Sequence, residues 1–133
     1  HGEPDSPQAL RGHRCIVIRE NDDTFNLWAL SDGTREVRVK VDGPLSANHG
    51  EVAADWALAG HGIVLRSEWD VAPLLRDGRL VRVLAPWVGA AADIHAIWPP
   101  HHRQSARVRA FADFLAARFA AQRTADGETA TAW

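Results

Sequence analysis

The chain has 133 residues, of which 46% are hydrophobic and 24% charged, and its formal net charge is −2. That length allows one ordinary domain, or a small domain with part of another. The low net charge gives no reason to expect nucleic acid or an acidic membrane surface as a direct partner. The single cysteine, Cys15, excludes an internal disulfide. No apolar run reaches membrane-spanning length and no signal-peptide core opens the chain, so we expect a soluble cytoplasmic protein.

The first residues are expected to form a linker followed by a helical turn and a strand. Residues 1–5 are polar, and because the chain contains no Met it reads as the interior of a longer gene product. Residues 7–11 predict one helical turn with Ser6 as its cap. The apolar run 15–18 predicts a buried strand, and Asn21-Asp22-Asp23 is typical of a turn.

A β-hairpin is predicted next. Residues 25–30 are extended in pattern around Trp28, and residues 31–34 have the composition of a hairpin loop in which Gly33 supplies a positive φ. The strand at 35–41 is therefore expected to pair with the strand around Trp28.

The centre of the chain, residues 37–67, predicts a βαβ unit. Val37, Val39 and Val41 alternate with charged residues, which indicates a half-buried strand. From Val52 the apolar period changes to that of a helix, with Val52, Trp56 and Ala59 expected on its buried face.

The helix exit and the next strand follow from small residues. Gly60 and Gly62 bracket the end of the helix, and residues 63–65 predict a short, fully buried strand. This order leaves residues 46–48 at the carboxyl end of a strand and the start of a helix, where open α/β sheets bind ligands.

The remaining elements are a short helix, two strands and a long helix. Ser67 is expected to cap a helix that ends at Asp77-Gly78. Residues 80–84 and 93–98 predict strands, with a crossover at 88–92 between them.

Ser105 opens the clearest helical pattern, and residues 123–133 are expected to form a disordered tail. The apolar positions of this last helix are Val108, Phe111, Ala112, Phe114, Leu115 and Phe119.

From about Leu10 to Phe119 the chain resembles the C-terminal part of LysR-type transcriptional regulators, within their effector-binding region. No single motif is specific, but the ordered series across most of the chain is. The series runs through Leu10, His13, Cys15 and Trp28; Gly43-Pro44-Leu45 with Asn48; Ala57-Leu58-Ala59-Gly60-His61-Gly62-Ile63; Gly78-Arg79-Leu80-Val81 and Leu84; Ile94-His95-Ala96-Ile97-Trp98-Pro99; and Ser105, Val108-Arg109-Ala110-Phe111 and Asp113-Phe114-Leu115.

The resemblance implies an α/β, periplasmic-binding-protein-like (type 2) effector domain with two subdomains around a small-molecule cleft. Residues 6–92 would form the complete second subdomain, and residues 93–122 the C-terminal strand and helix of the first. The family's helix-turn-helix lies outside this sequence, so we expect promoter DNA as a partner only of a full-length protein. The apolar face of the last helix is expected to pack on a second chain, on a separate or clipped N-terminal fragment, or back on its own subdomain.

The expected effector contacts begin with Ser46, Ala47 and Asn48. Backbone N–H groups at a helix start suit an anionic group such as a carboxylate, and the resemblance implies effector contacts on the same loop. The alternative is that Ser46 or Asn48 only caps the helix.

Four further residues complete the expected site. His61 either faces the cleft or is a solvent-facing turn residue. Leu65 and Arg66 end a strand beside the cleft, and Arg66 either binds a carboxylate bidentately or forms a surface salt bridge. Ile97 in the returning strand is also placed among the effector contacts.

Neither a metal site nor catalysis is expected. His95, His101 and His102 lack metal-ligand spacing, and Cys15 lies in an apolar run. Ser46 and His49 lack a nucleophile elbow and an acid behind the histidine, and there is no phosphate-binding glycine loop, so we expect no cofactor.

The sequence thus favours a truncated, ligand-sensing effector domain of a dimeric bacterial transcription regulator. The alternatives are a stand-alone small-molecule binding protein of the periplasmic-binding fold and an assembly element whose pocket is incomplete.

Overall fold

The computed structural model describes residues 2–20, 23–90, 95–102 and 105–125. The chain divides into two compact units, His1–Ala90 and Ala91–Trp133. Residues 91–94, which include the expected subdomain boundary after residue 92, lie outside the described residues.

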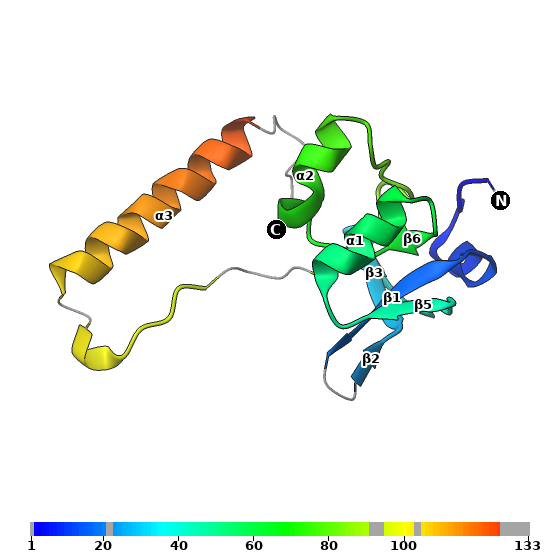
Figure 1. Ribbon diagram of the computed structural model, residues 1–133, viewed down its shortest axis with the longest axis horizontal. Coiled ribbons are helices and arrows are strands. Elements are labelled where there is room, and N and C mark those ends of the chain that lie inside the picture. The colour runs from blue at the N-terminus through cyan, green and yellow to red at the C-terminus, as the bar shows by residue number, and fades with distance from the viewer. Residues whose placement is uncertain (1, 21–22, 91–94, 103–104, 126–133) are drawn as a thin grey trace. The chain divides into compact units, whose positions relative to one another are not determined.

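Strand β1 (Cys15–Glu20) is the centre of the first sheet. It pairs in parallel with β5 (Leu45–Ala47) on one edge and with β6 (Ile63–Val64) on the other, and its far end pairs antiparallel with β2 (Asp23–Phe25). Helix α1 (Gly50–Leu58) connects β5 to β6 and packs across β1 (Figure 1). The predicted buried strand at 15–18 is confirmed, and its side chains are covered by α1 on one face and by the second sheet on the other.

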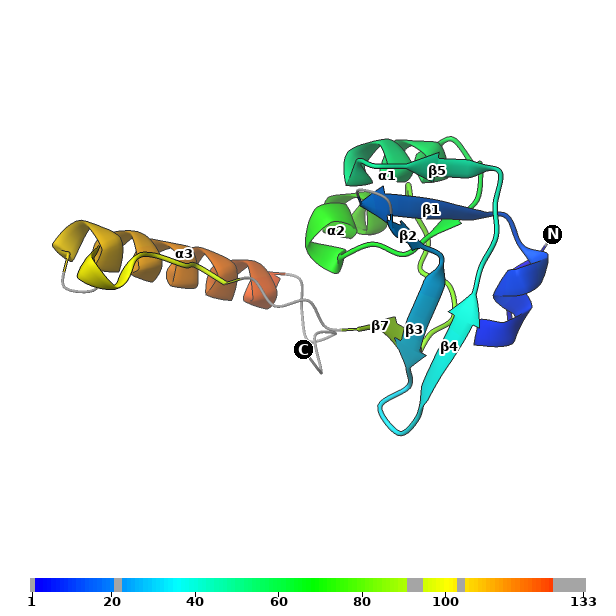
Figure 2. The same cartoon turned by 90° about the horizontal axis from the view of Figure 1, so that it is seen from below.

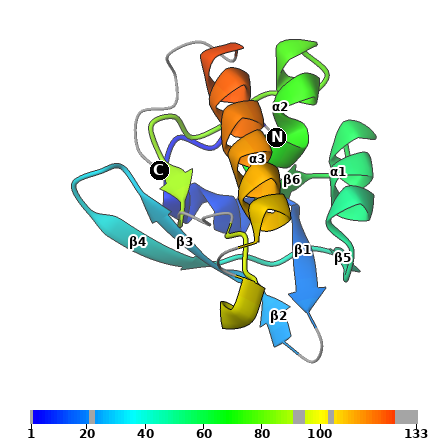
Figure 3. The ribbon, with the colours of Figure 1, turned by 90° about the vertical axis from the view of Figure 1, so that its left-hand side faces the viewer.

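A second sheet packs below the first (Figure 2). Strands β3 (Leu27–Ser31) and β4 (Glu36–Lys40) form an antiparallel hairpin, and β7 (Val88–Gly89) pairs with the other edge of β3. Figure 3 shows this hairpin projecting away from β1 and β5. The hairpin and its loop are as predicted: Gly33 has φ +87°, and Asp32 accepts hydrogen bonds from Thr34 and from the backbone and side chain of Arg35.

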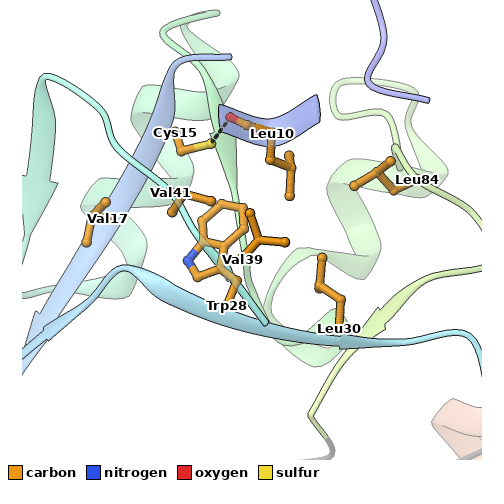
Figure 4. Packing of buried hydrophobic residues seen from close by; sticks show 8 residues of the cluster. All are labelled: Leu10, Cys15, Val17, Trp28, Leu30, Val39, Val41 and Leu84. Atoms are coloured by element: carbon orange, nitrogen blue, oxygen red, sulfur yellow. Dashed lines mark hydrogen bonds between the residues drawn. The ribbon is translucent and has the colours of Figure 1, made fainter. Parts of the chain in front are cut away.

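The main core lies between the two sheets (Figure 4). Its buried side chains come from both sheets, from the 3-10 helix η1 (Pro7–Gly12) and from the loop before β7. The chain passes so close to Cys15 at Gly43 that a Cβ on Gly43 would overlap the Cys15 carbonyl oxygen. The predicted turn at 7–11 is confirmed, but Ser6 does not cap it, because its hydroxyl bonds Asp5 instead.

The βαβ unit differs from the prediction at its first strand. Residues 37–41 belong to the second sheet, and the strand that leads into α1 is β5, which contains Ser46 and Ala47. A three-residue strand is too short to show periodicity, and it exists here because β1 offers it a free edge.

The buried face of α1 also differs from the prediction. Ala53 and Ala54 are buried, while Val52 and Ala59 are exposed. Alanine side chains let the helix approach the sheet closely, so small residues rather than the larger Val52 face β1. Trp56 packs against the buried cluster of Ile16, Ala47 and Ala53. Gly60 ends the helix with φ +78°, as predicted.

Three predicted strands need correction. Ile63-Val64 is only partly buried, and residues 80–84 form no strand. Val81 is 77% exposed and Leu84 has φ +61°, outside the extended region that a strand requires. Described residues 95–98 likewise have no regular structure. Conversely, the predicted crossover at 88–92 begins with strand β7.

Both later helices are present. Helix α2 (Glu68–Arg76) buries Val71 and Ala72, although Ser67 makes no capping side-chain bond. In the second unit, the 3-10 helix η2 (Pro100–His102) precedes α3 (Ala106–Ala125), which runs into the segment expected to be a tail. No helix within the described ranges is long and apolar enough to cross a membrane.

Cys15 makes the stability of the first unit sensitive to alkaline pH. Its thiol is buried and donates a hydrogen bond to the Leu10 carbonyl oxygen at 3.6 Å. Burial, with a smaller contribution from the charge of Asp42, raises the pKa of the thiol to about 11. The unfolded chain therefore releases this proton at lower pH than the folded chain does.

We predict that folding stability contributed by Cys15 is complete below about pH 8.5 and is lost as pH rises through about 11, a loss of about 3 kcal/mol. Urea unfolding at a series of pH values measures the free energy of unfolding, and Cys15→Ala should remove its decrease with rising pH. The chain has no Tyr and only Lys40 as a lysine, so few other groups titrate in this window. Equal slopes in the wild type and the variant would contradict the prediction.

Candidate functional site

The start of α1 is covered by the side chain of Arg66. Arg66 follows the carboxyl end of β6, and its guanidinium lies against Gly50, the first residue of α1. A Cβ built on Gly50 would overlap the guanidinium atoms. Gly50 therefore leaves the space that the guanidinium occupies, and its φ is not unusual.

Arg66 is held from the other side by Asp70. A guanidinium Nη2 donates a short, charge-assisted hydrogen bond to the Asp70 carboxylate, which lies in the first turn of α2. The Arg66 side chain is only 20% exposed, whereas that of Asp70 is 50% exposed. Among the described residues, the Arg66 Nε is the buried side-chain nitrogen that has no hydrogen-bond partner. A largely desolvated cation with an unused donor thus lies at the start of a helix.

The first turn of α1 has no side-chain cap. Its N-cap residue is His49, which makes no capping side-chain hydrogen bond, and Asn48 is exposed. The interpretation of Ser46 or Asn48 as a simple helix cap is therefore wrong. Backbone N–H groups at an uncapped helix start are hydrogen-bond donors with a partial positive charge.

The sheet separates the other residues of the predicted loop. Ala47 is buried in the cluster beneath α1, together with Ile16 and Ala53. Ser46 is paired with Val17, whose side chain belongs to the core between the sheets, so alternation directs Ser46 to the face away from α1. Leu65 packs on that same core. On the face of the sheet that α1 covers, Ser46, Ala47 and Leu65 therefore present no exposed side chain near Arg66.

His61 lies at the other end of the sheet from Arg66, and Ile97 belongs to the second unit. His61 precedes β6, and the neighbouring Ile63 N–H bonds the carbonyl of Arg14 just before β1. Because β6 and β1 are parallel, His61 lies at the amino end of the sheet, whereas Arg66 lies at the carboxyl end. Ile97 belongs to the second unit and is 91% exposed.

The second unit carries an apolar groove of about 470 Å³. Segment 95–98 forms one side of it and α3 the other, where Phe111 is 61% exposed. Phe114, on the same helix, is 63% exposed. Exposed aromatic side chains of this size on one helix indicate a surface that packs against another element. As for metals, the described residues contain no group of three His, Cys, Asp or Glu that could hold an ion.

Comparison with known proteins identifies the family. The family model of the LysR substrate binding domain matches residues 1–120. The chain belongs to the LysR substrate-binding domain family. The HTH-type transcriptional activator TtdR of Escherichia coli (strain 536) is 46% identical over 115 residues, which is 86% of this chain and 37% of that protein. The HTH-type transcriptional regulator DmlR of Escherichia coli K12 is 41% identical over 120 residues, covering 90% of this chain and 39% of that protein.

Solved structures agree on the fold. CrgA, a LysR-type transcriptional regulator from Neisseria meningitidis, matches with a TM-score of 0.70 and 29% identity over 89% of this chain and 40% of that chain. The regulatory domain of AphB variant C227S from Vibrio vulnificus matches with a TM-score of 0.58 and 25% identity, covering 68% of this chain and 48% of that chain. The predicted periplasmic-binding-protein-like α/β architecture is thereby confirmed, and no enzyme is among these relatives. The chain spans well under half the length of the TtdR and DmlR proteins it matches.

Arg66 was predicted from the sequence, but Gly50 and Asp70, which position its guanidinium, were not. The signal for Asp70 was available, because Arg66 and Asp70 are four residues apart across the start of a helix. The signal for Gly50 was weaker: glycine is not a favoured residue inside a helix, and its presence at the first position hints at close approach.

We predict that the effect of Gly50→Ala on folding stability differs in sign between the wild type and an Arg66→Ala variant. In the wild type it destabilises the first unit by up to about 1 kcal/mol, because the new Cβ displaces the flexible end of the Arg66 side chain and weakens its pair with Asp70. In an Arg66→Ala background the same change is neutral or stabilising by up to about 1 kcal/mol, because alanine favours the helix.

Urea unfolding of the four chains measures this double-mutant cycle. Additive effects of the two substitutions would show that Arg66 does not lie against Gly50.

Proposed function

We propose that this chain is the effector-sensing part of a LysR-type transcription regulator and that it binds a small anionic effector beside Arg66. In the whole cytoplasmic protein, a helix-turn-helix domain would contact promoter DNA. Support comes from the family match and from the names of the relatives, which are transcriptional activators or regulators. Effector binding would alter the arrangement of the domain and thus promoter activity.

One observation supports an anionic effector: the largely buried Arg66 guanidinium lies at the start of α1, which has no side-chain cap. A guanidinium presents donors in a planar fork that matches a carboxylate, and partial burial strengthens that contact relative to one in water. The helix start adds N–H donors and a favourable field for negative charge. The two features select the same ligand charge independently.

The neighbouring groups fit a small ligand. The exposed Asn48 side chain can donate and accept hydrogen bonds two residues before α1 begins. Glu51 is the acidic residue in the first turn of α1, but its side chain is 87% exposed and therefore well screened. Arg66 and Asn48 are thus the principal contacts of this proposal. Ser46, Ala47, His61, Leu65 and Ile97 remain predicted contacts with less support.

We predict that Arg66→Ala lowers affinity for anionic effectors by about tenfold or more, because a charge-assisted contact is worth about 1.5–3 kcal/mol. A thermal-shift screen of small carboxylates against the wild-type chain finds ligands, and calorimetric titration of the variants measures the loss. Arg66→Lys keeps the charge but removes the fork, so it recovers affinity only in part.

Arg82→Ala is the matched control, since Arg82 is an exposed arginine on the same unit outside the site. Unchanged carboxylate binding by Arg66→Ala would contradict the proposed site. Binding of neutral analogues as strongly as their carboxylates would contradict the anionic effector.

We also propose that α3 mediates self-association. The groove between α3 and segment 95–98 exposes Phe111, and burying one such side chain stabilises an interface by about 2 kcal/mol. We predict that Phe111→Glu weakens self-association at least about tenfold, because a charge would replace a buried ring.

Sedimentation equilibrium measures this effect, and Ala117→Glu, at an exposed position on the same helix, is the control. A wild-type chain that is monomeric at all concentrations would contradict self-association through α3.

A further inference from the structure

The Arg66–Asp70 pair links the starts of two helices. Arg66 lies against the first residue of α1, and its Nη2 reaches the carboxylate of Asp70 in the first turn of α2. The resting position of this cation therefore depends on a carboxylate supplied by the chain itself.

We propose that Asp70 is an internal substitute for the anionic group of the effector, which displaces it from Arg66 on binding. This inference rests on the proposed function and adds a specificity-determining residue to the same site. A ligand must then outcompete a carboxylate, so neutral ligands cannot occupy the site.

The hydrogen bonds of Arg66 show what the ligand gains. Nε and one terminal nitrogen lie on the same edge of a guanidinium, where a carboxylate can accept two parallel bonds. Asp70 bonds Nη2, while the buried Nε has no partner. Once Asp70 has left, a free carboxylate at this edge would satisfy both nitrogens, whereas Asp70 is tied to α2 and satisfies one.

The exposures of the two partners indicate which one leaves. The Asp70 side chain is half exposed, so water can solvate its carboxylate as soon as the pair opens. The Arg66 side chain is four-fifths buried and stays against Gly50, where it needs an anionic partner. Exchange of one carboxylate for another therefore keeps the buried cation paired throughout.

Displacement would also release the first turn of α2. In the resting state Arg66 joins α1 and α2 through one ion pair, and ligand binding would exchange that pair for a contact between Arg66 and the ligand. The start of α2, with Glu68 and Asp70, would then be free to move relative to α1. Such a change at the ligand site is the kind of local event that a bistable domain can amplify.

The test uses the full chain with succinate as the carboxylate probe and succinamide as its neutral counterpart. Asp70→Asn should bind succinate about two- to fivefold more tightly than the wild type, because the half-exposed Asp70 carboxylate competes for Arg66 with about that strength. Asp77→Asn, at the other end of α2, is the matched control and should bind like the wild type. Succinamide should bind to none of the chains.

A second readout follows Arg66 directly. In nitrogen-15 NMR spectra, the proton resonance of the Arg66 Nε–H should move downfield when succinate binds, because this buried group gains a hydrogen-bond acceptor. Weaker or unchanged succinate binding by Asp70→Asn, with binding still lost in Arg66→Ala, would overturn this inference and leave the proposed function standing. Equal succinate binding by Arg66→Ala and the wild type would overturn both.

Discussion

Parallel pairing of β5 and β6 with the two edges of β1 is the constraint on which the candidate site depends. Ile16 is paired with Leu45 on one side and Val64 on the other, so α1 must cross over β1 to connect the two outer strands. The crossover brings the start of α1 to the carboxyl edge of the sheet, which is where β6 delivers Arg66. Without this arrangement, Gly50 and Arg66 would be sixteen positions apart in the chain with no reason to meet.

Close packing then converts this topology into chemistry. Alanines on α1 allow the helix to lie close to the sheet, and Gly50 leaves space at its first residue for a guanidinium. The result is a cation that is mostly removed from water yet only partly hydrogen-bonded. Such a group has a strong preference for an anionic partner, and Asp70 supplies one at rest.

Much of the fold was predictable because it rests on local patterns. The β3–β4 hairpin follows from alternation and a loop containing Gly33, and α3 follows from apolar residues at helical spacing. The strand predictions were wrong where strand formation depends on a pairing partner elsewhere in the chain. Residues 80–84 have the composition of a strand but lack a ladder, whereas Leu45–Ala47 have no strand pattern and pair with β1. Strand formation depends on an available edge, which is not a local property.

The sequence by itself determined the family, the α/β class and the presence of Arg66 near a strand end. Only the tertiary structure decided which residues share the site. It placed Ser46 and Leu65 on the face of the sheet away from α1, and His61 at the amino end of the sheet. It also brought Arg66 into contact with Gly50 and Asp70. The physical reason is that a side chain's face depends on register and its neighbours on crossover, and both are set by contacts between residues distant in sequence.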